Sequence, residues 1–291
     1  MIKTLMQAVE AAAARLLLLL FALLSLDRAS ALGGRLARMI GPWLPVSGVA
    51  RRNLCRAYPE KSAAEIAAVV LGMWDNLGRV AGEYAHLGEI DVTDPDGRVE
   101  VVGIENVERL RDDGRGGIFF SAHLGNWEIA PLGATQNGVA LTQIYRAANN
   151  PHMEPILRSL RAPVGGIHYP KGAGGAKKLI EALSRGEHLG MLVDQKLNEG
   201  IAVPFFGRDA MTAPALAQLA LRFGCPVVPA RVERLDGAHF RLTVYPPLTL
   251  ATSGDRQADI AAAMGQINAL IEEWIRARPE QWLWLHRRWP D

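Results

Sequence analysis

The 291-residue sequence has little cysteine and almost no net charge. Its two cysteines, Cys55 and Cys225, lie far apart without metal-ligand spacing. This excludes a disulfide framework, fits a reducing compartment and makes neither thiol a strong nucleophile candidate. The net charge of +2 gives no basic field that would favour nucleic acid. Hydrophobic residues make up 49% and charged residues 21%, so the chain is globular, with one large or two small domains.

Several catalytic and nucleotide-binding motifs are also missing from the sequence. There is no G-x-S-x-G nucleophile elbow, which weighs against an α/β-hydrolase, and there is no Walker A motif. The glycine-rich stretch 172–177 fails the dinucleotide fingerprint because Lys177 stands where a third glycine is expected. The histidines show no H-x3-H pairing. We therefore expect neither a metal nor a cofactor.

The N-terminal segment is strongly apolar. Residues 11–26 are interrupted only by Arg15 and Ser25, and 16 residues fall short of the ~20 that cross a bilayer core. Three interpretations stay open: a cleaved signal peptide, a retained anchor that spans or lies on the membrane, and an ordinary buried helix. A retained anchor followed by Arg28, Arg35 and Arg38 would place the downstream chain in the cytoplasm.

The rest of the chain is predicted to be helical up to about Leu87 and to alternate between strands and helices after that. A second amphipathic helix is predicted over 31–44, and Ser62 with Glu65 forms a capping-box pattern that opens a helix to about Leu87. After a turn at 94–97, β-rich runs alternate with helical stretches. The β-rich runs are 99–102, 117–120, 141–145, 189–193, 227–232 and 240–244, and the helical stretches are 126–135, 151–161, 173–185, 213–223 and 256–278.

This alternation predicts an α/β fold with a mixed, largely parallel sheet covered by helices on both faces. No repeat or low-complexity segment divides the chain after the turn. We therefore predict two parts: an N-terminal extension of membrane-anchoring or amphipathic helices over residues 1–40, and a single α/β domain over residues 41–291.

One segment, residues 116–128, carries the residues of a possible active site. It runs from a strand through a polar turn into a helix, and ligands bind at the carboxyl ends of strands in such sheets. His123 and Glu128 would lie ~140° apart on one helix, so they can meet only if His123 precedes the helix and Glu128 lies in its first turn. Gly125 permits such a bend, and Asn126 is a favourable N-cap.

In that geometry the pair could act as a general base. A carboxylate that holds one imidazole nitrogen leaves the other free to take a proton from an alcohol. The positive end of the helix would favour the ionised form of Glu128. A lone H-x4-E pattern is common by chance, however, so a structural or exposed His123 remains the alternative interpretation.

Several blocks of the sequence, in order, resemble a known family. HLGNWE at 123–128 resembles the H-x4-D/E signature of the glycerolipid acyltransferase superfamily, and its Gly-Asn-Trp-Glu form resembles the bacterial lipid A late acyltransferase branch, the lauroyl and myristoyl transferases. Blocks similar to that branch occur from the N-terminal region to the tail: Leu44-Pro45, Arg52-Asn53-Leu54, 57–60, 144–146, Asn150-Pro151, Val193-Asp194-Gln195, 203–207, 210–212 and 281–289.

The resemblance implies an inner-membrane enzyme of lipid A and lipopolysaccharide biosynthesis whose catalytic domain faces the cytoplasm. It would move a fatty acyl group from acyl-ACP (acyl carrier protein) or acyl-CoA to a hydroxyl of a lipid A precursor. His123 would be the general base and Glu128 its orienting partner. By position in the motifs, the implied substrate-binding residues are Arg146, Asp194, Gln195, Asn126, Phe205 and Phe206.

Alternatives to this interpretation remain at several levels. The acceptor could be another membrane lipid, such as a lysophospholipid or an aminolipid, and Lys196 departs from the branch pattern. A lipid esterase and a non-catalytic lipid-binding protein are further possibilities. Either Arg146 or backbone N–H groups could stabilise an oxyanion. Phe205 and Phe206 could be core residues or an acyl-tunnel wall, and Arg287 and Arg288 a solvated terminus or a contact for lipid phosphate or an acidic carrier.

Overall fold

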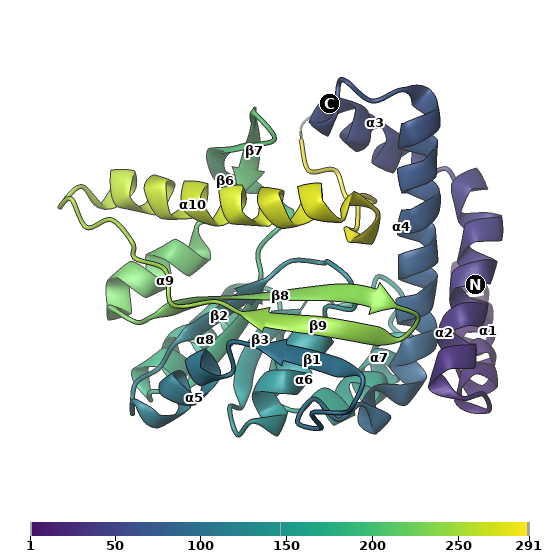
Figure 1. Cartoon of the computed structure of the whole chain (residues 1–291), viewed down its shortest axis with the longest axis horizontal. Helices are drawn as coiled ribbons and strands as arrows, with labels where there is room; N and C mark the ends of the chain where they lie inside the picture. Colours follow the sequence, from purple (N-terminus) through teal and green to yellow (C-terminus); the bar gives the residue numbers. More distant parts are fainter. Residues whose placement is uncertain (1, 146, 290–291) are drawn as a thin grey trace.

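The computed structural model describes residues 2–145 and 147–289, and its centre is a seven-stranded sheet (Figure 1). The strand order is β1-β9-β8-β2-β5-β3-β4. All neighbours pair in parallel except β8 and β9, which are antiparallel. The strands are β1 (Val99–Val102), β2 (Ile118–Ser121), β3 (Leu141–Tyr145), β4 (Ile167–Pro170), β5 (His188–Leu192), β8 (Val227–Asp236) and β9 (His239–Val244). The predicted mixed, largely parallel α/β fold is confirmed.

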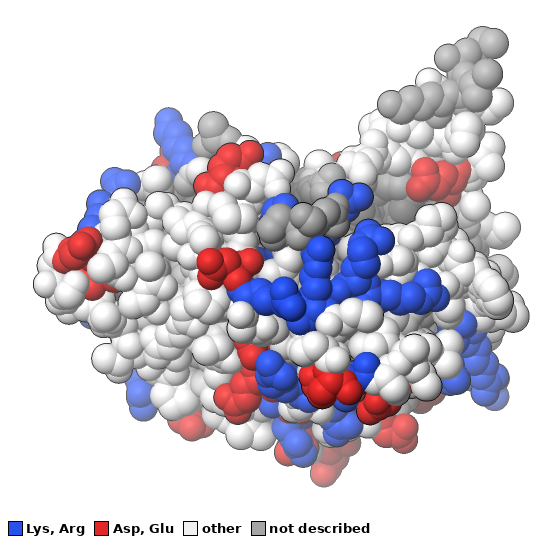
Figure 2. All heavy atoms as spheres, turned by 90° about the horizontal axis from the view of Figure 1, so that it is seen from above, with Lys and Arg blue, Asp and Glu red and all other residues white. Residues whose placement is uncertain are grey.

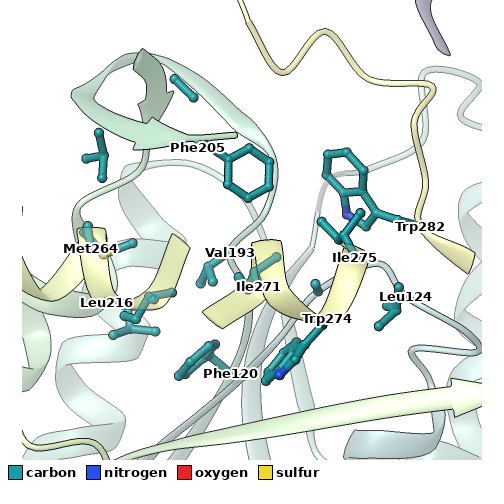
Figure 3. Close-up of a cluster of buried hydrophobic side chains, with 14 of the residues drawn as sticks. Phe120, Leu124, Val193, Phe205, Leu216, Met264, Ile271, Trp274, Ile275 and Trp282 are labelled. Carbon is teal, nitrogen blue, oxygen red and sulfur yellow. The ribbon is translucent and has the colours of Figure 1, made fainter. Parts of the chain in front are cut away.

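Helices cover both faces of the sheet, and the central strand β2 is buried on both sides. Ile118 and Phe120 belong to one buried cluster and Phe119 to the other, as expected from the alternation of side chains along a strand. Phe120 stacks on Trp274 of α10, close to Ile271 (Figure 3). The first cluster includes residues of α8 (Ala173–Ser184), α9 (Ala215–Phe223) and α10 (Arg256–Ala277), and the second residues of α5 (Glu105–Asp112) and α6 (Ile129–Gln136).

Helix α4 (Ala63–Glu83) stands along the edge of the sheet with α1 and α2 outside it (Figure 1). The predicted capping box at its start is present, with Ser62 and Glu65 bonded reciprocally. Helix α2 (Leu26–Ile40) packs against α4 through glycines, since a Cβ added to Gly33 would lie 2.1 Å from the carbonyl oxygen of Gly78. Only glycine permits this approach of the two backbones.

Helix α1 (Ile2–Ala22) is the one helix of the described residues that is long and apolar enough to cross a membrane. Only 11% of its apolar window, Thr4–Ala22, is buried in the protein. An ordinary core helix would be mostly buried, so that interpretation of the N-terminal segment is wrong. The exposed apolar helix is consistent with membrane anchoring.

Five elements are absent from the sequence-based prediction. The antiparallel hairpin of β6 (Lys196–Phe205) and β7 (Arg208–Thr212) forms a separate two-stranded sheet, and its register shifts between Lys196 and Ile201. That irregularity removes the alternating pattern that identifies a strand. Strand β4 is short and lies at the sheet edge, and α3 (Ser47–Ala57) and α5 are short helices rich in charged residues. Helix α6 begins at Ile129, later than the predicted Asn126.

Candidate active site

The register of the sheet brings His123 and Asp194 together. Strands β2 and β5 are parallel neighbours in which Ser121 pairs with Leu192. His123 and Asp194 each follow their strand by two residues, so they leave the same edge of the sheet side by side. This is the carboxyl edge at which ligands bind in α/β sheets. The prediction that His123 lies beyond the end of a strand is confirmed.

The Asp194 carboxylate holds the His123 ring and backbone together. His123 Nδ1 lies 2.8 Å from Asp194 Oδ1, and the His123 backbone N–H donates to Oδ2 over 2.9 Å. Trp282 Nε1 donates to the same Oδ2 over 2.7 Å. A carboxylate accepts hydrogen bonds, so Nδ1 carries the proton and Nε2 presents its lone pair. The ring is therefore oriented as a proton acceptor, and its side chain is 16% exposed.

The surroundings of Asp194 favour its ionised form and keep a neighbouring histidine neutral. Burial alone would raise the pKa of Asp194, but the charge and hydrogen bonds of His123 outweigh it, and the pKa lies below its ordinary value. His286 Nε2 lies 3.2 Å from the Asp194 carbonyl oxygen, to which it donates, and burial lowers the pKa of His286 to about 4. The site thus pairs one anion with two imidazoles, of which His286 stays uncharged at neutral pH.

Glu128 does not hold His123, so the predicted contact between them is wrong. Tyr84 donates a 2.6 Å hydrogen bond to Glu128 Oε1, and Arg161 reaches the same oxygen with Nε at 3.0 Å and Nη2 at 2.9 Å. Between these described residues no hydrogen bond joins Glu128 to His123. Burial, and then the charge of Glu128, raise the pKa of Tyr84 well above its usual range, so Tyr84 stays a hydrogen-bond donor. A contribution of Glu128 to catalysis remains a prediction.

A buried polar network fixes the turn between His123 and Glu128. Asn126 is fully buried, donates to Glu83 over 2.9 Å and accepts from the Glu128 backbone N–H at 3.2 Å. Glu83 is paired with the buried Arg234, whose Nη2 lies 2.9 Å from Glu83 Oε2. Asn76 donates to the carbonyl oxygen of Gly125 over 3.0 Å. Asn126 thus supports the turn from inside, which corrects its prediction as a residue that contacts substrate.

The other predicted cleft residues occupy different environments. The Gln195 side-chain amide lies at the second ring nitrogen of His123, with its Nε2 3.4 Å from His123 Nε2. Phe205 and Phe206 are buried and pack on Trp289 at centroid distances of 5.8 and 6.2 Å. This supports the core interpretation of the two phenylalanines rather than a tunnel wall. Arg146 lies outside the described residues.

The two C-terminal arginines point in opposite directions. Arg288 is fully buried and donates to Thr212 Oγ1 over 2.9 Å, so it is neither solvated nor available to a ligand. Arg287 is exposed and follows His286 on the segment that covers Asp194. The tryptophans of the tail, Trp282, Trp284 and Trp289, are buried packing residues and not interfacial anchors.

A basic surface lies above this segment. Figure 2 shows Lys and Arg side chains gathered on the face seen from above, where Figure 1 places α3, β7 and the C-terminus. Arg208 of β7 donates to the carbonyl oxygen of Arg56 of α3 over 3.2 Å, and Arg276 of α10 stacks over Phe206 at 4.5 Å. We call Arg56, Arg208 and Arg276 the basic patch.

No thiol chemistry is indicated at the site. Burial raises the pKa of Cys225 to about 11, so its thiolate is scarce at neutral pH, and Cys55 belongs to α3. In the described parts of the chain, no group of three or more His, Cys, Asp or Glu side chains is placed to hold a metal ion.

Four residues of the site were not predicted from the sequence: Tyr84, Arg161, Trp282 and His286. Trp282 and His286 lie in a tail block similar to the acyltransferase branch, which was the available signal. Tyr84 is 44 residues and Arg161 33 residues from Glu128, and neither carries a motif. Only the folded chain reveals their contact.

Comparisons with known proteins identify the family to which the chain belongs. A family model described as bacterial lipid A biosynthesis acyltransferase matches residues 5–291. The chain is 28% identical over 273 residues to the lipid A biosynthesis palmitoleoyltransferase of Escherichia coli, covering 88% of this chain and 83% of that protein. It is 28% identical over 255 residues to the E. coli lipid A biosynthesis lauroyltransferase, covering 82% and 78%.

A more distant relative is named for a different acceptor lipid. The phosphatidylinositol mannoside acyltransferase of Mycolicibacterium smegmatis is 24% identical over 251 residues, covering 82% of this chain and 78% of that protein. Because the family model spans nearly the whole sequence, the chain belongs to the bacterial lipid A biosynthesis acyltransferase family and is an acyltransferase.

Proposed function

We propose that this protein transfers a fatty acyl group from acyl-ACP or acyl-CoA to a hydroxyl of a lipid A precursor. In this proposal His123 is the general base, and Asp194, not Glu128, orients it. The observation that carries the proposal is the 2.8 Å contact between His123 Nδ1 and Asp194 Oδ1, which directs the Nε2 lone pair away from the carboxylate. Family membership and the partly exposed ring support it.

The reaction follows from the chemistry of the two substrates. The acceptor hydroxyl attacks the thioester carbonyl while Nε2 takes its proton, and the C–S bond breaks as the tetrahedral oxyanion collapses. The imidazolium then returns the proton to the leaving sulfur, which yields an ester and a free thiol. A positioned base of this kind contributes about 10²–10⁴-fold. The anionic Asp194 stabilises the imidazolium as it forms.

The oxyanion and the second carboxylate need separate roles. Gly125 N–H is already bonded to the Gln281 carbonyl over 3.1 Å, which leaves Arg146 or another backbone N–H of the turn as the proposed oxyanion donor. Glu128 holds Arg161 and lies at the start of α6. We assign Glu128 an indirect role, in which it fixes this cation beside the site.

Two surfaces of the molecule support the proposal: the basic patch for the acyl donor, and helix α1 for the membrane. Both acyl-ACP and acyl-CoA carry negative charge, which complements the basic patch. Helix α1 would anchor the enzyme in the inner membrane, with the catalytic domain facing the cytoplasm as the arginines after it predict. No nucleic acid is involved in this proposal.

The test is a transfer assay with His123→Ala. Purified protein is incubated with a lipid A precursor and acyl donors of different chain length and carrier, and the product is weighed by mass spectrometry. We expect His123→Ala to lower transfer by at least about a hundredfold. His239→Ala, at an exposed histidine of β9, two strands from β2, is the matched control. Near-normal transfer by a folded His123→Ala protein would overturn the mechanism.

The same assay separates the alternative functions. Similarity to a phosphatidylinositol mannoside acyltransferase makes another membrane glycolipid the second candidate acceptor, so the acceptor panel includes one. An esterase would release fatty acid without any acceptor. A non-catalytic lipid-binding protein would yield no product with any donor.

A further inference from the structure

Helix α1 contacts the protein along one narrow seam. Gln7, Ala11, Ala14, Leu18 and Phe21 recur at spacings of four and three residues and are its most buried described side chains. The apolar side chains between them point outward, among them Leu16, Leu19 and Leu20, which are 61%, 64% and 49% exposed. The helix thus presents an apolar surface to its surroundings while staying attached to the body.

A hollow of about 440 Å³ opens between α1 and α7 (Glu154–Arg161). Its lining is mostly apolar, and we call it the α1–α7 hollow. The lining residues are Arg15, Leu18, Leu19, Ala22, Ala85, Pro155, Ile156, Ser159 and Leu160. A second hollow near the start of α1 has a mixed lining, in which the polar residues Gln7, Glu10 and Asn150 stand beside apolar ones. The two hollows therefore suit different chemistry.

Arg15 is the one charged residue that lines the α1–α7 hollow. It interrupts the apolar run of α1, and within the described parts of the chain it makes no hydrogen bond or ion pair. An unpaired cation beside apolar surface is costly where lipid replaces water. A ligand with an anionic headgroup and an acyl chain would satisfy both the guanidinium and the apolar wall.

The hollow adjoins the Glu128 side of the active site. Ala85 in its wall follows Tyr84, whose hydroxyl is bonded to Glu128. Helix α7, which forms the opposite wall, ends in Arg161, the cation that Glu128 holds. A ligand in the hollow would thus contact the two elements that supply both partners of Glu128.

We propose that the α1–α7 hollow binds an anionic phospholipid, with its phosphate on Arg15 and one acyl chain between α1 and α7. The proposal goes beyond the acyl-transfer mechanism, because lipid binding here does not need His123. The lipid is a phospholipid of the membrane in which the exposed apolar helix α1 would be anchored.

The test is photo-crosslinking of the full-length protein. The probe is phosphatidylglycerol with a diazirine in one acyl chain, incorporated into phosphatidylcholine vesicles, and labelled residues are mapped by mass spectrometry. We expect labels at residues 155–160, loss of these labels in Ser159→Trp, and about tenfold less labelling by phosphatidylglycerol in Arg15→Gln. A phosphatidylcholine probe of the same chain should not respond to Arg15→Gln.

Two matched controls separate a site from general contact with the membrane. Leu20→Trp introduces the same indole side chain on the outward face of α1, and Arg28→Gln removes an exposed arginine of α2. Both should label like the unaltered protein, and His123→Ala should too. Equal labelling in Ser159→Trp, Arg15→Gln and the controls would overturn the proposal.

Competition identifies the source of the lipid. An unlabelled anionic phospholipid should displace the probe, whereas an unlabelled lipid A precursor should not. Displacement by the precursor alone would assign the hollow to the acceptor and overturn the proposal. Photo-labelling is independent of transfer activity. A negative result for lipid binding in the hollow can therefore be distinguished from a negative result for the catalytic proposal.

Discussion

Asp194 and Glu128 are both buried carboxylates near the turn that follows β2, but they bind different partners. Asp194 binds the ring and backbone of His123 together with an indole N–H, whereas Glu128 binds a guanidinium and a phenol. The first arrangement selects a tautomer of a base, and the second neutralises a cation. Proximity in the sequence thus did not decide which carboxylate acts on the histidine.

The difference arises from the sheet. Glu128 follows His123 in the chain, but the turn carries it toward α4 and α7. Asp194 is 71 residues away, and the parallel register of β2 and β5 places it against the ring. The predictions below test this division of roles, from the largest expected effect to the smallest.

The largest expected effect concerns the turn that separates the two carboxylates. Glu83→Gln leaves Arg234 buried without its charge partner, and we expect the free energy of unfolding to fall by about 3–5 kcal/mol. Glu100→Gln breaks a partly exposed ion pair with Arg241 and should cost no more than about 1 kcal/mol. Thermal and denaturant unfolding measure both. Equal losses would show that the buried network does not stabilise the turn.

Removal of the charge of Asp194 should have the next largest effect. Asp194→Asn keeps the shape of the side chain but no longer selects the Nδ1–H tautomer of His123, so we expect kcat to fall by at least about a hundredfold. Asp259→Asn, at a buried aspartate bonded to Ser253, is the control and should keep its activity. Steady-state transfer kinetics decide the matter. An Asp194→Asn protein as active as the control would remove Asp194 from the mechanism.

His286, which is bonded to the Asp194 backbone, should make the free energy of unfolding depend on pH. Its pKa is about 4 in the folded chain against an ordinary 6.5, so between these values the unfolded chain binds the proton and the folded chain does not. Stability therefore falls as the pH drops from 6.5 toward 4, by about 2 kcal/mol between pH 7 and pH 5 from this group. Unfolding of His286→Gln at both pH values should show a shallower slope. An unchanged slope would contradict the burial of a neutral His286.

Loss of the Glu128 charge should have the smallest effect on transfer. Glu128→Gln weakens the hold on Arg161 but leaves the His123–Asp194 contact intact, so we expect about a tenfold loss of kcat/KM. The pH dependence of kcat/KM should stay that of the unaltered enzyme. A change in the apparent pKa of that profile would indicate that Glu128 acts on the base after all.

Local patterns predicted much of this arrangement. Apolar runs bounded by turn residues identified six of the seven strands of the main sheet, all but the edge strand β4, and Ser62 with Glu65 marked the start of α4 correctly. The strand-to-helix setting placed His123 at a strand end. These features depend on neighbours within a few residues, which a sequence displays directly.

The partners of the site residues could not be predicted in the same way. The contact of His123 with Asp194 requires β2 and β5 to be neighbours, and their order in the sheet is not encoded by the spacing of either strand. Tyr84 reaches Glu128 from the 3-10 helix after α4, and Arg161 reaches it from α7. The H-x4-E spacing points to Glu128 as the orienting carboxylate, but the folded chain has Asp194 in that position.

The most direct measurement is a pair of double-mutant cycles on transfer rate, one joining His123 to Asp194 and one joining His123 to Glu128. Residues that act as one unit lose no further activity when both are removed. The account predicts that Asp194→Ala adds nothing in a His123→Ala background, and that Glu128→Gln costs the same in that background as in the unaltered enzyme. Coupling of His123 to Glu128, with independent effects of His123 and Asp194, would contradict it.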